Sequence, residues 1–412
     1  MSVAGVAILG YGVVGAGTAR LLTAGRAGMA DRTGVSPELL HIVDIRTFPQ
    51  DPLEPLVTAD YDAVLADPRV RVVVETIGGT GAAFAFSKRA LASGRHVVTS
   101  NKELVAEHGP ELLELAASHG VRYLFEASVG GGIPIIHPMR HCLAANVIHT
   151  VSGILNGTTN YILTHMDQDD MSFAAALSEA QAHGFAEQRP EADIEGLDAG
   201  RKLAILSSLA FGVAVPWREI HTEGIAAIDA AGIDTAAQAG AQVKLFARAS
   251  RMADGRIAAS VQPVALSCTH PVCCASGVNN AIAVEGDAIG TAMFYGPGAG
   301  ALPTASAVVS DVLECLGGED SLPRLVWPPM PAGRMVPFEA QPVLVLGMRT
   351  AKPEKDLGAV LAAAGYGGRP LGDGKEVLVF GEDGTLTEGI LAGAAAACGG
   401  LPSGWIRFVR GS

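Results

Sequence analysis

Residues 3–15 have the sequence VAGVAILGYGVVG, and the helical pattern AGTARLL follows without a break. The apolar residues 3–10 predict a short strand, and the glycines after it predict a tight turn that opens a helix. Glycines let backbone N–H groups and the positive end of the helix approach a pyrophosphate. The stretch therefore predicts a dinucleotide-binding turn, with cofactor contacts from Gly10, Gly12, Val13, Val14 and Gly15.

Apolar segments of the same kind recur along the first third of the chain. They lie at residues 39–45, 70–77, 95–100 and 121–127, and helical patterns such as FAFSKRALASG separate several of them. Strands that alternate with helices in this way form a parallel sheet with helices on both faces. The sequence therefore predicts an α/β fold whose first domain, residues 1–127, is a Rossmann-type doubly wound parallel sheet.

Asp44 ends the second of these strands and bears on the choice of cofactor. A carboxylate at this point accepts hydrogen bonds from ribose hydroxyls and repels a 2′-phosphate, whereas Arg46 would attract that phosphate. The separation between Gly10 and Asp44 exceeds the usual spacing of about 20 residues, and residues 23–38 account for the difference by extending the crossover. The balance favours NAD over NADP.

Acidic side chains gather between residues 184 and 202, in the sequence GFAEQRPEADIEGLDAGRK. Only 17% of the chain is charged, so this concentration is unusual. A helical pattern begins at residue 197, and Asp198 and Lys202 fall four residues apart on one face, where both can contact one ligand. The alternative interpretation is a surface ion pair worth about 0.3–0.5 kcal/mol. The other acids of the segment favour a site; they are Glu187, Glu191, Asp193 and Glu195.

The rest of the chain predicts further domains. Residues 128–295 contain three adjacent glycines and the polar turn Asn156-Gly157-Thr158, which either approach a ligand or form plain tight turns. Residues 296–320 return the chain to the nucleotide domain, and the proline-rich residues 321–339 form a linker. Residues 340–412 have the order strand, helix, two strands, helix and strand, which is the βαββαβ order of a ferredoxin-like domain.

Composition and charge argue against several kinds of partner. The 412 residues carry a net charge of −13 without a basic cluster, which argues against nucleic acid and anionic membranes. No apolar run of 18 residues and no signal-peptide pattern is present, so we expect a cytoplasmic protein without a membrane span. Six cysteines lack metal-ligand spacing and are expected to be reduced. His137, His141 and His183 have no partner in the sequence, and we expect structural roles for them.

Seven motifs, in order over about the first 320 residues, resemble those of homoserine dehydrogenases. They are GYGVVG, ETIGG, HVVTSNKELVAEHG, FEASVGGGIPII, GILNGTTNYIL, the acidic segment described above and YGPGAGALPTASAVVSD. The resemblance implies NAD(P)-dependent interconversion of a small-molecule pair, L-homoserine and L-aspartate 4-semialdehyde, in threonine, isoleucine and methionine biosynthesis. It also implies that the middle domain is an α+β domain for substrate binding. Its apolar character favours a homodimer or a dimer of dimers.

The resemblance also assigns roles to individual residues. Lys202 resembles the proton donor to the carbonyl oxygen, and Asp198 and Glu187 resemble the acids that hold the substrate amino group and orient that lysine. Lys102 resembles a second essential lysine near the nicotinamide and the substrate. The other implied positions are substrate contacts at Asp193, Asn156, Gly157 and Thr158, and cofactor contacts at Lys102, Gly184 and Gly298. Asp44 departs from the family, because many of its members have an arginine at the end of the second strand.

A monovalent cation site, for Na⁺ or K⁺, is implied at the backbone carbonyls of Glu126, Val129, Gly131 and Ile133. Residues 340–412 lie where many bacterial relatives carry an ACT domain that senses amino acids. The Asp-x-Pro-Gly turn expected before its first helix is replaced by RTAKPEKD at residues 349–356, which argues against feedback by threonine.

Two other functions fit parts of the pattern. One is a non-catalytic sensor of nucleotides or amino acids, but the joint presence of Lys102, Glu187, Asp198 and Lys202 favours an enzyme. The other is a dehydrogenase that acts on another amino-acid semialdehyde or on aspartate itself. No cysteine is suitably placed to attack an aldehyde, which argues against a phosphorylating aldehyde dehydrogenase.

Overall fold

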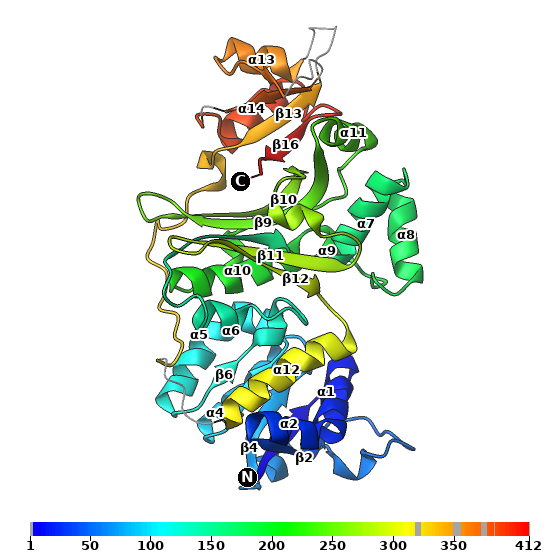
Figure 1. Cartoon of the computed structure of the whole chain (residues 1–412), viewed down its shortest axis with the longest axis vertical. Helices are drawn as coiled ribbons and strands as arrows, with labels where there is room; N and C mark the ends of the chain where they lie inside the picture. Colours follow the sequence, from blue (N-terminus) through cyan, green and yellow to red (C-terminus); the bar gives the residue numbers. More distant parts are fainter. Residues whose placement is uncertain (1–2, 318–322, 349–355, 372–376, 383, 412) are drawn as a thin grey trace. The chain divides into compact units, whose positions relative to one another are not determined.

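A computed structural model describes residues 3–317, 323–348, 356–371, 377–382 and 384–411. The chain divides into two compact units (Figure 1). The first contains residues 1–146, 204–217 and 296–330, and the second contains residues 147–203, 218–295 and 331–412. These bounds differ from the predicted domains. The first unit continues beyond residue 127, and residues 340–412 share a unit with most of the middle domain.

The first unit is built on a six-stranded parallel sheet in the order β3-β2-β1-β4-β5-β6. The sheet grows outward from β1 in both directions, which confirms the predicted doubly wound arrangement. The last strand is shorter than predicted, because residues 126–128 turn into a short 3₁₀ helix. The strands are β1 (Val3–Leu9), β2 (Ser36–Val43), β3 (Val57–Thr58), β4 (Val70–Glu75), β5 (His96–Thr99) and β6 (Tyr123–Leu124).

Helices link these strands and cover the sheet (Figure 1). One of them, α2, occupies the long crossover between β1 and β2. The last, α12, returns the chain to this unit as predicted, and its buried Val308 and Val312 join the same apolar core as Ile8 and Val74. Gly17 of α1 lies so close to α12 that a Cβ there would be 2.8 Å from the Ala301 carbonyl oxygen. The helices are α1 (Val13–Ala24), α2 (Arg26–Thr33), α3 (Tyr61–Ala66), α4 (Gly81–Ala92), α5 (Lys102–Ser118), α6 (Ile136–Arg140) and α12 (Ala301–Leu316).

The second unit contains a ten-stranded mixed sheet. Its larger part runs in the order β12-β11-β7-β9-β10, with antiparallel pairing from β11 to β10, and β8 adds to β10 in parallel. These strands are β7 (Ile148–Ile154), β8 (His221–Thr222), β9 (Ala241–Arg251), β10 (Ile257–Ser267), β11 (Asn279–Gly286) and β12 (Gly290–Pro297). The helices are α7 (Gly157–Gln168), α8 (Phe173–Ala182), α9 (Glu191–Ile194), α11 (Ala230–Gln238) and the first half of α10 (Leu197–Phe211), whose residues 204–211 belong to the first unit.

The C-terminal residues confirm the predicted βαββαβ order. Their strands pair antiparallel in the order β16-β13-β15-β14. They do not form a separate sheet, because β16 pairs in parallel with β10 at Ala265 and Leu266. Of the segment RTAKPEKD, residues 349–355 lie outside the described residues. The elements are β13 (Leu344–Met348), α13 (Leu357–Ala363), β14 (Arg369–Pro370), β15 (Val377–Phe380), α14 (Glu388–Ala397) and β16 (Ile406–Val409).

The predicted linker, of which residues 323–339 are described, is anchored at both of its ends. In the first unit Trp327 is buried, with its ring 5.5 Å from that of Phe125. In the second unit the backbone around Val336 exchanges hydrogen bonds with Ile257 at the start of β10. The segment is therefore packed against the protein at both of its ends, which its prolines alone did not predict.

Candidate active site

The glycine turn after β1 is tight on one side and open on the other. Gly10 has a φ of +91°, and a Cβ at Gly15 would lie 2.0 Å from the Gly10 carbonyl oxygen, so neither position tolerates a side chain. A Cβ at Gly12 would meet nothing within 4 Å, and the neighbouring Val13 is 72% exposed. The open side presents the N-terminus of α1, which is suited to hold a pyrophosphate.

Asp44 follows the last residue of β2, as predicted, and faces this turn. Its carboxylate accepts the Tyr11 N–H at 2.8 Å and two guanidinium N–H groups of Arg46 at 2.9 and 2.8 Å. The Arg46 guanidinium holds the pKa of Asp44 well below its usual range, and the Tyr11 N–H acts in the same direction. The carboxylate is therefore ionised. The Asp44 side chain is 6% exposed, whereas the Arg46 side chain is 58% exposed.

Lys102 is the first residue of α5, at the carboxyl end of β5. A buried network holds this turn: Thr99 donates to Glu75 at 2.6 Å, and Asn101 caps α5 through Leu104 and donates to the Gly79 carbonyl. Glu75 is fully buried, and this burial raises its pKa. Sequence reasoning missed its role, although the ETIGG motif contains it.

Lys202 and Asp198 lie one turn apart on α10 and form a buried ion pair with a distance of 2.9 Å from Nζ to Oδ2. The same ammonium donates to the Leu155 carbonyl oxygen at 2.7 Å, just beyond the end of β7. Asn156 Nδ2 donates to Asp198 at 2.9 Å and to Asp193 at 2.7 Å, while its Oδ1 caps α7. The turn between β7 and α7, helix α9 and the start of α10 thus bring four predicted site residues together in the second unit, namely Asn156, Asp193, Asp198 and Lys202.

Other predicted residues have different surroundings. Gly157 permits close packing, because a Cβ there would lie 2.7 Å from the Val278 carbonyl oxygen. The Thr158 hydroxyl donates to the Phe185 carbonyl at 2.8 Å, next to the exposed Gly184 with its φ of +74°. Glu187 is exposed, and within the described part of the chain its carboxylate does not contact Lys202 or Asp198. Leu155 was not predicted, because a backbone carbonyl leaves no signal in a sequence.

The predicted cation loop follows β6 in the first unit. The carboxylate of Glu126 is already engaged, since it accepts the N–H groups of three residues that begin α6, at 2.5–2.8 Å. The carbonyl oxygens of Val129, Gly131 and Ile133 belong to buried residues, and no described N–H donates to them. A Cβ at Gly131 would lie 2.3 Å from the Gly298 carbonyl oxygen, so Gly298 abuts this loop.

Two homoserine dehydrogenase family models match this chain. A homoserine dehydrogenase NAD-binding domain matches residues 10–126, and a homoserine dehydrogenase domain matches residues 134–313. The chain belongs to the homoserine dehydrogenase family.

Individual homoserine dehydrogenases match over most of their length. One from Synechocystis sp. is 42% identical over 327 residues, which cover 76% of this chain and 73% of that protein. A homoserine dehydrogenase from Thiobacillus denitrificans, known from a crystal structure, has 33% sequence identity with this chain. The two structures superpose with a TM-score of 0.88 over 100% of this chain and 99% of the other. A hyperthermophilic archaeal homoserine dehydrogenase, solved in complex with NADPH, is 27% identical with a TM-score of 0.65 and covers 79% of this chain and 100% of its own.

This homoserine dehydrogenase is an NAD(P)-dependent oxidoreductase that interconverts L-homoserine and L-aspartate 4-semialdehyde. The fold and enzyme class expected from the sequence are therefore confirmed. Among the helices of the described residues, none combines the length and the hydropathy that a membrane crossing requires.

Proposed function

We propose that Lys202 is the proton donor and acceptor of the homoserine dehydrogenase reaction and that Asp198 orients it. One observation supports this assignment above the others: Lys202 is 8% exposed, and its ammonium lies between the Asp198 carboxylate and the Leu155 carbonyl oxygen. These partners engage two of its three hydrogens, and among the described residues the third has no acceptor. That hydrogen is the one offered to the substrate oxygen.

The chemistry requires a proton at this position. Reduction of the aldehyde adds a hydride to the carbonyl carbon and leaves negative charge on the carbonyl oxygen. Lys202 would stabilise that charge and transfer one proton to the oxygen, which produces the hydroxyl of homoserine and a neutral amine. In the oxidation direction the amine takes the proton back as the hydride leaves the carbon. When bound, the nicotinamide dinucleotide supplies or takes up the hydride.

We assign Asp193, Asp198 and Asn156 to the recognition of the substrate's amino group. The Asn156 amide joins two carboxylates, whereas Asp198 alone is paired with Lys202. A substrate ammonium beside these two carboxylates would offset part of their negative charge, as the burial of charged groups requires. This arrangement would favour an amino-acid aldehyde over an aldehyde that lacks the amino group. The further role of Glu187 rests on the resemblance alone.

We further propose that NAD(H) is preferred to NADP(H). The ionised Asp44 faces the glycine turn, where it would accept from ribose hydroxyls and repel a 2′-phosphate. Arg46 opposes this preference, because its exposed guanidinium lies beside the same carboxylate and would attract a 2′-phosphate there. The archaeal relative is bound to NADPH, so the preference of this chain depends on the balance between these two residues.

We propose Lys102, fixed at the start of α5, as a second lysine needed for turnover.

The unengaged carbonyl oxygens of Val129, Gly131 and Ile133 support a monovalent cation site in the first unit, with the Glu126 carbonyl as a fourth ligand. A cation there would replace the missing N–H donors of these buried carbonyls. Its identity as Na⁺ or K⁺, the homodimer and the cytoplasmic location stay predictions.

The roles of the two acids are separated by Asp198→Asn and its matched control Asp193→Asn. Both substitutions keep the side-chain size, and both acids accept from Asn156. We expect D198N to lower kcat by about 10²-fold or more, because Lys202 loses its ion pair. We expect D193N to raise the KM for homoserine with a smaller effect on kcat. Absorbance of the reduced nicotinamide measures both constants, and a normal kcat for D198N would contradict the proposal.

A further inference from the structure

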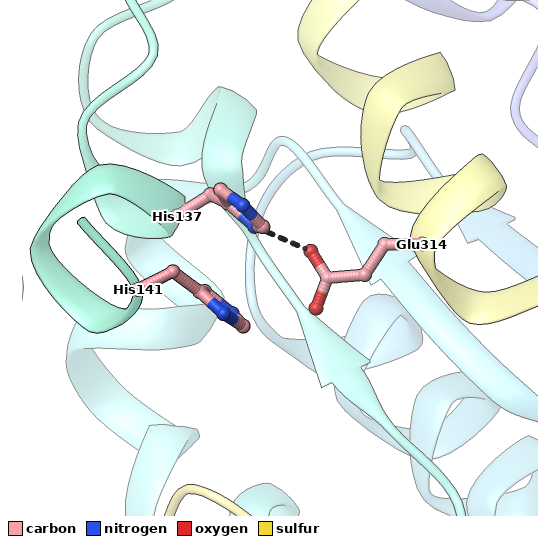
Figure 2. Close-up of side chains that lie close together, drawn as sticks. All are labelled: His137, His141 and Glu314. Atoms are coloured by element: carbon pink, nitrogen blue, oxygen red, sulfur yellow. Dashed lines mark hydrogen bonds and ion pairs between the residues drawn. The ribbon is translucent and has the colours of Figure 1, made fainter. Parts of the chain in front are cut away.

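His137, His141 and Glu314 form a cluster of possible metal ligands in the first unit (Figure 2). None of the three was predicted to contact the substrate or the cofactor. His137 lies on α6, His141 follows that helix directly, and Glu314 lies on α12. One ligand atom from each residue can be chosen so that all lie within 4.8 Å of one another. His137 Nδ1 and Glu314 Oε2 are already 3.0 Å apart.

The geometry of the two histidines suits a shared ligand. They are four residues apart, so both project from the same side of the helical turn, and their rings stack with centroids 4.0 Å apart and an angle of 14° between planes. Figure 2 shows both rings beside the Glu314 carboxylate. The second carboxylate oxygen, Oε1, is buried and has no hydrogen-bond partner among the described residues. His137 is 48% exposed and leaves a path from solvent.

We propose that these three side chains bind a divalent transition-metal ion of the zinc class. Two imidazole nitrogens and one carboxylate oxygen are a ligand set that Zn²⁺ accepts, with a fourth position left for water. Tetrahedral zinc places ligand atoms roughly 3.4 Å apart. The present spacings, at most 4.8 Å and with one pair at 3.0 Å, therefore need only small adjustments. The buried Glu314 oxygen without a partner would become a ligand or accept from the metal-bound water.

This site differs in chemistry from the cation loop before α6. The loop offers backbone carbonyl oxygens, which suit Na⁺ or K⁺, and the Glu126 carboxylate there is used to hold the N-terminus of α6. Imidazole nitrogens do not suit those ions, whereas they are strong ligands for zinc and its neighbours. The two sites would therefore select different metals.

A bound metal would cross-link α6 to α12. Their segments already meet at Glu126, whose N–H donates to the buried Asp311 carboxylate of α12 at 2.8 Å, and at Gly131, which abuts Gly298. Metal binding would therefore stabilise the region that carries the carbonyl loop. Arg140 lies on α6, and its positive charge lowers the pKa of Asp311. The same charge would repel a metal ion bound nearby.

Titration of the full-length chain with Zn²⁺, followed by calorimetry and by the unfolding temperature, tests the proposal. We expect one ion bound per chain, a raised unfolding temperature, and an affinity at least tenfold weaker in His137→Gln and in His141→Gln. His165→Gln is the matched control, because His165 forms an (i, i+4) pair with Asp169 but belongs to no such cluster of three ligands among the described residues. It should bind Zn²⁺ like the unmodified chain.

Failure of the unmodified chain to bind Zn²⁺ would overturn the proposal. So would zinc binding that persists unchanged in both H137Q and H141Q, since that ion would be held by other groups such as the exposed Cys142 or Cys268. His137 is half-exposed, so its replacement should not disturb folding, and H137Q alone can carry the test if H141Q does not fold. Far-ultraviolet circular dichroism of each variant, measured without metal, verifies its fold.

Discussion

Replacement of Lys202 by methionine should separate catalysis from cofactor binding. Methionine keeps most of the apolar stem and removes the ammonium, so the change acts on the contacts to Asp198 and Leu155. A general acid in this position is typically worth about 10²–10⁴-fold in rate, which corresponds to roughly 2.7–5.5 kcal/mol of the activation barrier. We therefore expect kcat for homoserine oxidation to fall by that factor.

The same substitution should also destabilise the second unit. Breaking a buried ion pair by removing one partner costs about 3–5 kcal/mol. Asn156 still donates to Asp198 in the variant, so we expect the lower end of that range. The glycine turn lies in the first unit, and reduced cofactor should bind K202M as it binds the unmodified chain. Fluorescence titration measures that binding, and absorbance of the reduced nicotinamide measures turnover.

Lys244→Met is the matched control for lost stability. Lys244 is 2% exposed in the same unit and donates to Asn160 Oδ1 at 3.1 Å and to the Ala275 carbonyl at 2.7 Å. We expect K244M to lower the unfolding temperature and to keep most of its turnover. Lys202→Arg should not restore the rate, because a guanidinium does not give up its proton. Normal turnover by folded K202M would refute the proposed role of Lys202, and so would a loss of turnover in folded K244M as large as that in K202M.

Three further outcomes are expected. The kcat/KM for NAD(H) should exceed that for NADP(H), and Asp44→Ala should narrow the difference; the opposite preference would mean that Arg46 controls the pocket. A chain ending near Pro331 should keep measurable turnover but lose stability, because β10 loses its pairing with β16; a folded truncation without turnover would contradict this. Burial lowers the pKa of His96 from 6.5 to about 4. Below pH 6.5 the unfolded chain therefore binds a proton at His96 that the folded chain does not bind. The free energy of unfolding should then fall by up to about 3 kcal/mol between pH 6.5 and 4. Denaturant titrations at several pH values measure this pH dependence, and His96→Gln should remove it.

The fold was largely predictable because its signals are local. The glycines from Gly10 to Gly15 and the alternation of apolar strands with helices specify a doubly wound sheet through short-range rules. The packing of the linker segment around Trp327 could not be predicted, for the converse reason. Prolines predict a break in secondary structure, but whether the segment packs depends on distant residues such as Phe125. The pairing of β16 with β10 is equally non-local, and no periodicity announces it.

The candidate site was predictable where side chains carry it. Asp198 and Lys202 are four residues apart, and helical geometry alone brings them together. The Leu155 carbonyl and the support of Glu75 under the Lys102 turn could not be predicted, because they depend on how strands end in space. His137 and His141 were expected to be structural, since Glu314 lies far away in the sequence and supplies the third ligand only after folding.

The late position of α12 in the chain has a consequence for the synthesis of this protein on the ribosome. This helix supplies Val308 and Val312 to a core whose other members, such as Ile8 and Val74, leave the ribosome much earlier. At roughly 5–20 residues per second, synthesis of the chain between residues 146 and 296 takes about 8–30 s. During that time the nascent nucleotide-binding sheet exposes the apolar surface that α12 later covers. Chaperone protection of the emerging chain would matter most in this interval.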